Sequence, residues 1–185
     1  MPRNKEFAAA ARELGTLLAM RGHTLVYGGS NLGLMGVVSG AAMAAGGKVT
    51  GIIPTLFSEA IINSQPVTQL VRVASMAERK ELIIKTCDAF IALPGGIGTI
   101  DEVSEVLVAN QLGTVRGVPR QAVAFDTPKD DNPMVLVNID GFYDGFLAQM
   151  KLVMDEGLMR SEAGLAVAAT AAEALDLAER HGASK

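Results

Sequence analysis

Apolar residues recur along the chain at two different spacings, and their succession predicts alternating helices and strands. Near the N-terminus a helical spacing joins Phe7, Ala10, Leu14, Leu17 and Leu18. Asn4 is placed to cap the start of this helix and Gly22 to end it. The next apolar run, residues 24–27, is short and ends in a glycine turn, which indicates a buried strand.

The same alternation continues to the C-terminus. Further strands are predicted over residues 49–53, 70–74, 89–93, 122–125, 135–139 and 165–169, and helices over 34–45, 76–86, 100–111, 142–156 and 171–181. This order is typical of an α/β fold with a mostly parallel sheet covered by helices on both faces, here as a single domain spanning residues 1–185. Such sheets bind ligands at the carboxyl ends of their strands, so candidate chemistry is sought in the loops that follow strands.

Composition and charge narrow the function classes. Hydrophobic residues make up 49 % of the chain and charged residues 19 %, which favours a folded domain. The net charge of -4 and the lack of a basic cluster argue against a nucleic-acid partner. The uncharged run 24–47 is interrupted by a Gly-Gly-Ser-Asn break, so we expect a strand and a helix there and no membrane segment.

Cysteine and histidine usage points to a reducing compartment without a metal site. Cys87 is the one cysteine, so it can form neither an internal disulfide nor a thiolate cluster. The two histidines, His23 and His181, are far apart in the sequence. We therefore expect a cytoplasmic protein that holds no metal.

The strongest motif for chemistry lies between a predicted strand and a predicted helix, over residues 93–102. Gly95, Gly96 and Gly98 allow backbone amides to approach a ligand closely, and a helix N-terminus favours an anion such as phosphate. Thr99 and Glu102 have a second interpretation as a capping box. The glycines favour a phosphate loop with a carboxylate one helical turn away.

Two further loops follow strands. In residues 75–80, Ser75 and Glu78 have capping-box spacing, while Arg79 and Lys80 place two cations near the positive end of a helix, a local conflict typical of functional sites. The alternative is that both cations point into water.

The other loop contains Gly28 and Gly29 and leads into a helix with Met35, which we expect in the core or in a pocket wall. Gly33, Gly36 and Gly40 lie on one side of that helix and predict close packing on the sheet.

Together the motifs around Gly28–Gly36, Met76–Lys80 and Pro94–Glu102, with Asn138–Asp144, resemble the Lonely Guy family of cytokinin riboside 5′-monophosphate phosphoribohydrolases. The resemblance implies a Rossmann-like fold, an AMP-like nucleotide substrate and a homodimer. It implies that Arg79 and Glu102 are catalytic and that the nucleotide-binding residues are Lys80, Gly95, Gly96, Gly98 and Thr99, with Gly28, Gly29 and Met35. Family members are often called lysine decarboxylases, but nothing here identifies a pyridoxal phosphate lysine, and we expect no cofactor.

Cleavage of a ribosyl C–N bond passes through an oxocarbenium-like state, which a carboxylate such as Glu102 can stabilise while it orients water. Arg79 is expected either to bind the 5′-phosphate or to assist departure of the base. The activity predicted is hydrolysis of AMP or N6-substituted AMP. The alternative is a non-catalytic nucleotide-binding or carrier protein of the same fold.

Two departures from the family pattern affect the predicted sheet. Members usually begin with a strand and a Gly-Ser turn before the first helix, whereas this sequence begins at the helix, so the N-terminal strand is expected to be missing. We favour a natural start upstream of Met1 over completion of the sheet by residues 122–125. The stretch 121–133 resembles an insertion, and Asp101 stands where the family commonly has Glu.

Overall fold

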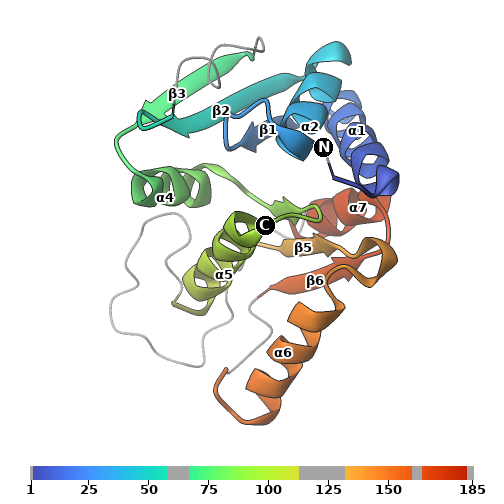
Figure 1. Ribbon diagram of the computed structural model, residues 1–185, viewed down its shortest axis with the longest axis vertical. Coiled ribbons are helices and arrows are strands. Elements are labelled where there is room, and N and C mark those ends of the chain that lie inside the picture. Colours follow the sequence, from blue (N-terminus) through green and yellow to red (C-terminus); the bar gives the residue numbers. More distant parts are fainter. Residues whose placement is uncertain (1, 58–66, 113–131, 160–163, 183–185) are drawn as a thin grey trace. The chain divides into compact units, whose positions relative to one another are not determined.

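The computed structural model describes residues 2–57, 67–112, 132–159 and 164–182 (Figure 1). It divides the chain into two compact units, Met1–Ile83 and Ile84–Lys185. Each unit contains a sheet of three parallel strands among the residues described. The strand predicted over residues 122–125 lies outside the described residues, as does most of the apparent insertion.

The first unit contains the sheet β1-β2-β3. Its elements are α1 (Lys5–Met20), β1 (Thr24–Tyr27), α2 (Gly33–Ala44), β2 (Lys48–Pro54), β3 (Gln69–Val73) and the start of α4 (Met76–Thr86). β2 is parallel to both neighbours, with Gly51 opposite Tyr27 and Leu70. The Asn4 side chain accepts a hydrogen bond from the Glu6 amide at 2.9 Å, which confirms the predicted N-cap.

Helices α1 and α2 lie side by side in this unit (Figure 1). The contact is close because Gly15 has no side chain: a Cβ there would overlap the Val38 carbonyl oxygen and lie 3.0 Å from Ala41 Cβ. On the sheet side, Ala42 of α2 packs with Tyr27 and Val49 in a buried cluster. The helix pair therefore depends on small residues at the line of contact.

The second unit contains the sheet β4-β5-β6. Its elements, after the end of α4, are β4 (Phe90–Ala92), α5 (Ile97–Leu112), β5 (Met134–Val137), the 3₁₀ turn η1 (Ile139–Gly141), α6 (Asp144–Asp155), β6 (Leu165–Ala168) and α7 (Ala171–Gly182). All four residues of β5 are buried. Val135 and Val137 pack with Ala174 and Ala178 of α7. Because side chains alternate along a strand, the buried Met134 and Leu136 lie on the other face, so both faces of β5 are covered.

The predicted parallel α/β fold is confirmed, with one difference in the sheet. The described strands form two three-stranded sheets instead of one continuous sheet. The single domain stays a prediction.

Two of the three glycines of α2, Gly33 and Gly36, do not serve helix–sheet packing as expected. Gly33 has a φ of +57° with nothing near its missing side chain, and Gly36 makes room for the Asn31 carbonyl. These two residues therefore shape the turn before α2.

Close packing at Gly15 predicts opposite effects of alanine at two helical glycines. Gly15→Ala is expected to lower the free energy of unfolding by about 1–3 kcal/mol, because the methyl group overpacks the α1–α2 contact. Gly145→Ala in α6 is expected to raise it by about 0.4–1 kcal/mol, since nothing lies within 4 Å of that position. Urea unfolding of both variants measures this difference, and equal stability of the two would contradict the packing described.

Candidate functional site

The loop after β1 holds three of the predicted site residues against one another. A Cβ added at Gly28 would overlap the Arg79 guanidinium, lying 2.9 Å from its Cζ, and would lie 3.2 Å from Met35 Sδ. Only glycine lets the guanidinium pack onto the backbone at this point. Gly29 turns the chain here with a φ of +75°, a conformation that other residues adopt at a cost.

Arg79 is held in this position by the start of α4. Ser75 Oγ accepts a hydrogen bond from the Glu78 amide at 3.1 Å, and Glu78 Oε2 accepts one from the Ala74 amide at 2.7 Å. The capping pair is thereby confirmed, with the carboxylate reaching Ala74 instead of Ser75. It fixes the first turn from which the Arg79 side chain extends.

The Arg79 side chain is 9 % exposed, and its Nη1 donates to Met76 Sδ at 3.6 Å. The alternative that Arg79 points into water is wrong. Lys80, the next residue, is half-buried. A cation thus lies at the carboxyl end of β1, against a backbone segment without side chains.

The predicted phosphate loop lies in the second unit, between β4 and α5. Helix α5 begins at Ile97, three residues before the predicted start, and the Gly96 carbonyl accepts hydrogen bonds from the Thr99 and Ile100 amides. Gly96, Ile97 and Gly98 are exposed. The first turn of α5 therefore presents its N-terminal amides to solvent, as an anion site requires.

The capping-box interpretation of Thr99 and Glu102 is wrong, because Thr99 is already the third residue of α5. Its side chain instead lies over Gly95: a Cβ at Gly95 would overlap Thr99 Oγ1 and lie 2.8 Å from Thr99 Cβ. Glu102 follows Gly98 by one helical turn and is half-buried, whereas its neighbour Asp101 is exposed. The loop and Glu102 thus lie on one short helical segment.

A contact that the motifs did not predict joins this loop to the end of β5. Tyr143 Oη donates a hydrogen bond of 2.6 Å to the carbonyl oxygen of Leu93, the residue before Pro94. The motif Asn138–Asp144 enters the sequence prediction only through the family resemblance. Its own signal is an aromatic hydroxyl six residues after the buried strand β5.

Cys87 is not equipped for nucleophilic chemistry. Burial, and to a smaller extent the Asp88 charge, raises the pKa of its thiol to about 12. The thiolate is therefore scarce at neutral pH.

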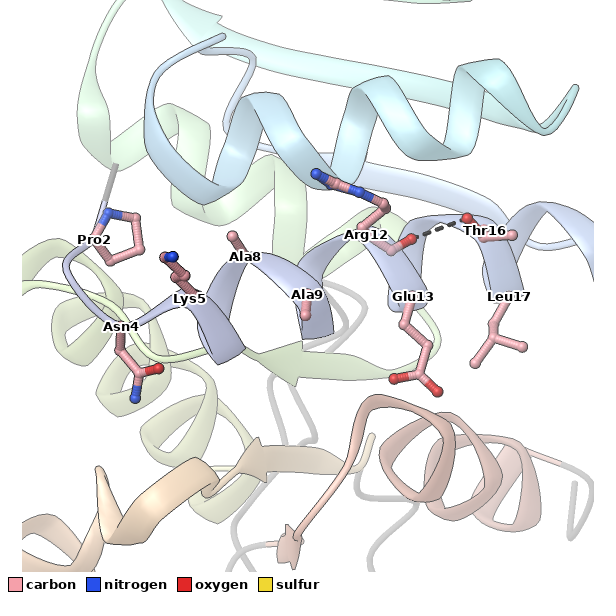
Figure 2. Close-up of a pocket in the computed structure, with 9 residues that line it drawn as sticks. All are labelled: Pro2, Asn4, Lys5, Ala8, Ala9, Arg12, Glu13, Thr16 and Leu17. Atoms are coloured by element: carbon pink, nitrogen blue, oxygen red, sulfur yellow. Dashed lines mark hydrogen bonds between the residues drawn. The ribbon is translucent and has the colours of Figure 1, made fainter.

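The pocket on α1 does not include the predicted site residues. Figure 2 shows a hollow lined by α1 and the turn before it, with Arg12, Glu13 and Leu17 among its residues, and none of the candidate residues line it. No group of three or more His, Cys, Asp or Glu suited to a metal ion occurs in the described ranges. No helix among the described residues is long and apolar enough to cross a membrane.

The structure thus describes two separate groups of predicted site residues, one in each unit, here called the first and second half-site after the single site that the sequence predicts. The first, in the unit Met1–Ile83, brings together Gly28, Met35 and Arg79. The second, in the unit Ile84–Lys185, brings together Gly95 and Thr99 on the segment that carries Glu102. The pairing of Arg79 with Glu102 stays a prediction.

Comparison with known proteins identifies relatives over most of the chain. Residues 35–179 match a family described as "possible lysine decarboxylase". A rice (Oryza sativa subsp. japonica) protein named cytokinin riboside 5′-monophosphate phosphoribohydrolase LOG is 39 % identical over 161 residues, 87 % of this chain and 60 % of that protein. The Arabidopsis thaliana protein of the same name with the designation LOG4 is 35 % identical, over 87 % of this chain and 68 % of that protein. The chain spans about three fifths of the length of the first of these relatives.

Solved structures agree on the fold. The molybdenum cofactor carrier protein of Chlamydomonas reinhardtii superposes with a TM-score of 0.67 at 24 % identity, covering 97 % of this chain and 90 % of that one. The molybdenum cofactor binding protein of Rippkaea orientalis gives a TM-score of 0.66 at 22 % identity, covering 94 % and 86 %. At these identities the likeness shows a shared Rossmann-like fold.

The match to the family's sequence model covers most of the chain. The relatives named cytokinin riboside 5′-monophosphate phosphoribohydrolase are 35–39 % identical to this chain. The motifs that carry the resemblance also form the loops after β1 and β4 and the first turn of α4. The chain belongs to the Lonely Guy family, the family whose model is described as possible lysine decarboxylase.

Proposed function

We propose that this chain hydrolyses the N-glycosidic bond of AMP or N6-substituted AMP, releasing the free base and ribose 5-phosphate. The observation that carries the proposal is the second half-site, in which an exposed glycine-rich helix N-terminus lies one helical turn before the half-buried Glu102. The names of relatives at 35–39 % identity give the reaction its class.

The proposed site binds the nucleotide at its phosphate and cleaves it at C1′ of the ribose. Amides of residues 95–98 and the positive end of α5 suit the 5′-phosphate. Water adds to C1′ as the C–N bond breaks, and the electron pair of that bond leaves with the base, which takes up a proton. Glu102 stabilises the positive charge that develops on the ribose and accepts a hydrogen bond from the attacking water.

Arg79 contributes a buried positive charge at the end of β1. It is proposed to bind the 5′-phosphate or to assist departure of the base, and Lys80 and Met35 belong to the same half-site. A guanidinium packed on a side-chain-free backbone is held in few orientations, which suits either role.

The alternative of a non-catalytic carrier is not favoured. The carriers resemble this chain at 22–24 % identity, a level that shows fold alone. The relatives at 35–39 % identity are named hydrolases. The decarboxylase description is not adopted either, since the sequence offers no lysine with the ring partners of pyridoxal phosphate.

Glu102→Gln is expected to lower the turnover of AMP by about 10²-fold or more, because it keeps the shape of the side chain and removes the charge that stabilises the transition state. Chromatography of released adenine measures the rate. Glu105→Gln makes the same chemical change on an exposed position of the same helix and is expected to keep the parental rate. An unchanged rate in Glu102→Gln would refute its proposed role.

Arg79→Ala is expected to impair either turnover or nucleotide affinity by about tenfold or more, since a charge-assisted contact to the substrate is lost. Lys85→Ala removes an exposed cation later in the same helix and is expected to be nearly silent. Steady-state kinetics with AMP and a thermal unfolding curve are recorded for both variants. Equal losses of activity in the two would show that folding, not the site, is affected.

We also propose that the chain forms a homodimer in the cytoplasm. Apolar side chains are exposed on α5, where Ile97 is 86 % and Val108 and Leu112 are each 53 % exposed. Light scattering at micromolar concentration is expected to report about twice the chain mass of 19.3 kDa, because association would cover such residues. A species of 19.3 kDa alone would contradict the dimer.

A further inference from the structure

The glycine loop between β4 and α5 has two ends, and the helix holds only one of them. At its C-terminal end the Gly96 carbonyl accepts hydrogen bonds of 3.0 Å and 3.3 Å from the Thr99 and Ile100 amides. The other end begins at Leu93, one residue after β4 ends at Ala92. Between them stand Pro94, which has no amide hydrogen, and the glycines, whose backbone is conformationally free. The geometry of the loop therefore depends on what holds Leu93.

Tyr143 holds that end. Its hydroxyl donates the 2.6 Å hydrogen bond to the Leu93 carbonyl, and the residue is 1 % exposed. Phe142 packs edge-on against its ring, with centroids 5.0 Å apart. The phenol is therefore fixed by packing on the ring and by a hydrogen bond at its tip.

The backbone of Tyr143 is fixed as well. Asn138 donates its amide to the Ala168 carbonyl of β6 at 2.8 Å, which ties it to the sheet. Its side chain accepts from the Tyr143 amide at 2.7 Å and donates to Asp144 Oδ1 at 2.8 Å. The turn between them includes Asp140 at a φ of 52° and Gly141 at 70°. These contacts fix the position of the Tyr143 hydroxyl relative to the carboxyl end of β5, the strand that pairs with β4.

Burial raises the pKa of the Tyr143 hydroxyl to about 12. The group therefore remains protonated, and remains a donor to Leu93, throughout the neutral and mildly alkaline range.

We propose that Tyr143 is a positioning residue: its hydroxyl holds the loop of residues 94–98 in the geometry that binds the phosphate of the substrate. The inference rests on the proposed function for the identity of the ligand. The loop itself contacts the ligand, and Tyr143 acts through it. The loop is proposed to bind the phosphate equally in the ground state and the transition state, and loss of such uniform binding raises KM and leaves kcat unchanged.

Tyr143→Phe removes one hydroxyl and keeps the ring. The KM for AMP is expected to rise about fivefold or more while kcat changes less than about twofold, because uniform binding is lost when the Leu93 carbonyl loses its partner. A merely structural role would lower the melting temperature and the active fraction without moving KM.

Asn132→Ser is the matched control. Asn132 is fully buried, and its side chain donates a 2.8 Å hydrogen bond to the Cys87 carbonyl. Cys87 and Asn132 precede β4 and β5, so this variant also removes a buried donor from a backbone carbonyl, but at the opposite edge of the same sheet. It is expected to lower the melting temperature and to keep the KM of the parent chain. An unchanged KM in Tyr143→Phe, or an equal rise in both variants, would overturn the proposal.

A second readout separates this inference from the proposed function. In ¹⁵N–¹H spectra, the amide signals of Gly95, Gly96 and Gly98 are expected to shift or broaden in Tyr143→Phe and to keep their positions in Asn132→Ser. Failure of the parent chain to hydrolyse AMP would refute the function, whereas these spectra would still decide whether Tyr143 holds the loop. Unmoved glycine signals in Tyr143→Phe would refute the positioning role.

Discussion

In each unit three parallel strands end at one edge of a sheet, and each chain segment that leaves that edge loses the hydrogen bonds of the strand ladder. Such a segment needs new partners for its backbone. After β4 the Leu93 carbonyl accepts a hydrogen bond from the Tyr143 hydroxyl, and the Gly96 carbonyl accepts hydrogen bonds from amides in the first turn of α5. After β1 the backbone at Gly28 lies against the Arg79 guanidinium. In each unit, the predicted site residues lie on the segment that leaves the sheet or pack against it.

Glycine serves the two half-sites in different ways. At Gly28 the missing side chain leaves space that a cation of the protein itself occupies. At Gly96 and Gly98 the backbone remains open to solvent, so that an anion from outside can reach it. The loop after β1 therefore packs against a positive charge of α4, and the loop after β4 presents amide dipoles on the helical segment that carries Glu102. The proposed substrate carries a phosphate and a ribose that would become cationic during the proposed reaction.

The sequence pattern predicted the local features well and the long-range ones poorly. The Asn4 cap, the strand at residues 24–27 and the Ser75–Glu78 pair depend on neighbours in the chain, and all three are found. The predicted start of α5 is three residues too late, because the glycines before Thr99 are typical of a loop and do not reveal that the Gly96 carbonyl already accepts helical hydrogen bonds.

Arg79 and Tyr143 show why the rest was out of reach. Burial of Arg79 depends on a glycine about fifty positions away, and the Tyr143–Leu93 hydrogen bond spans 50 positions. Neither contact leaves a periodic signal in the sequence. The positions of both loops nevertheless follow from the sequence, since ligands bind at the strand ends of a parallel sheet.

We propose that the chain breaks the bond between base and ribose and leaves the phosphate ester intact. The most direct test is a product balance for AMP incubated with the parent chain, with adenine, adenosine, ribose 5-phosphate and inorganic phosphate all quantified over time. We expect adenine and ribose 5-phosphate to appear in equal amounts. Formation of adenosine and inorganic phosphate, or binding of AMP without cleavage, would show that the chain does not catalyse this reaction.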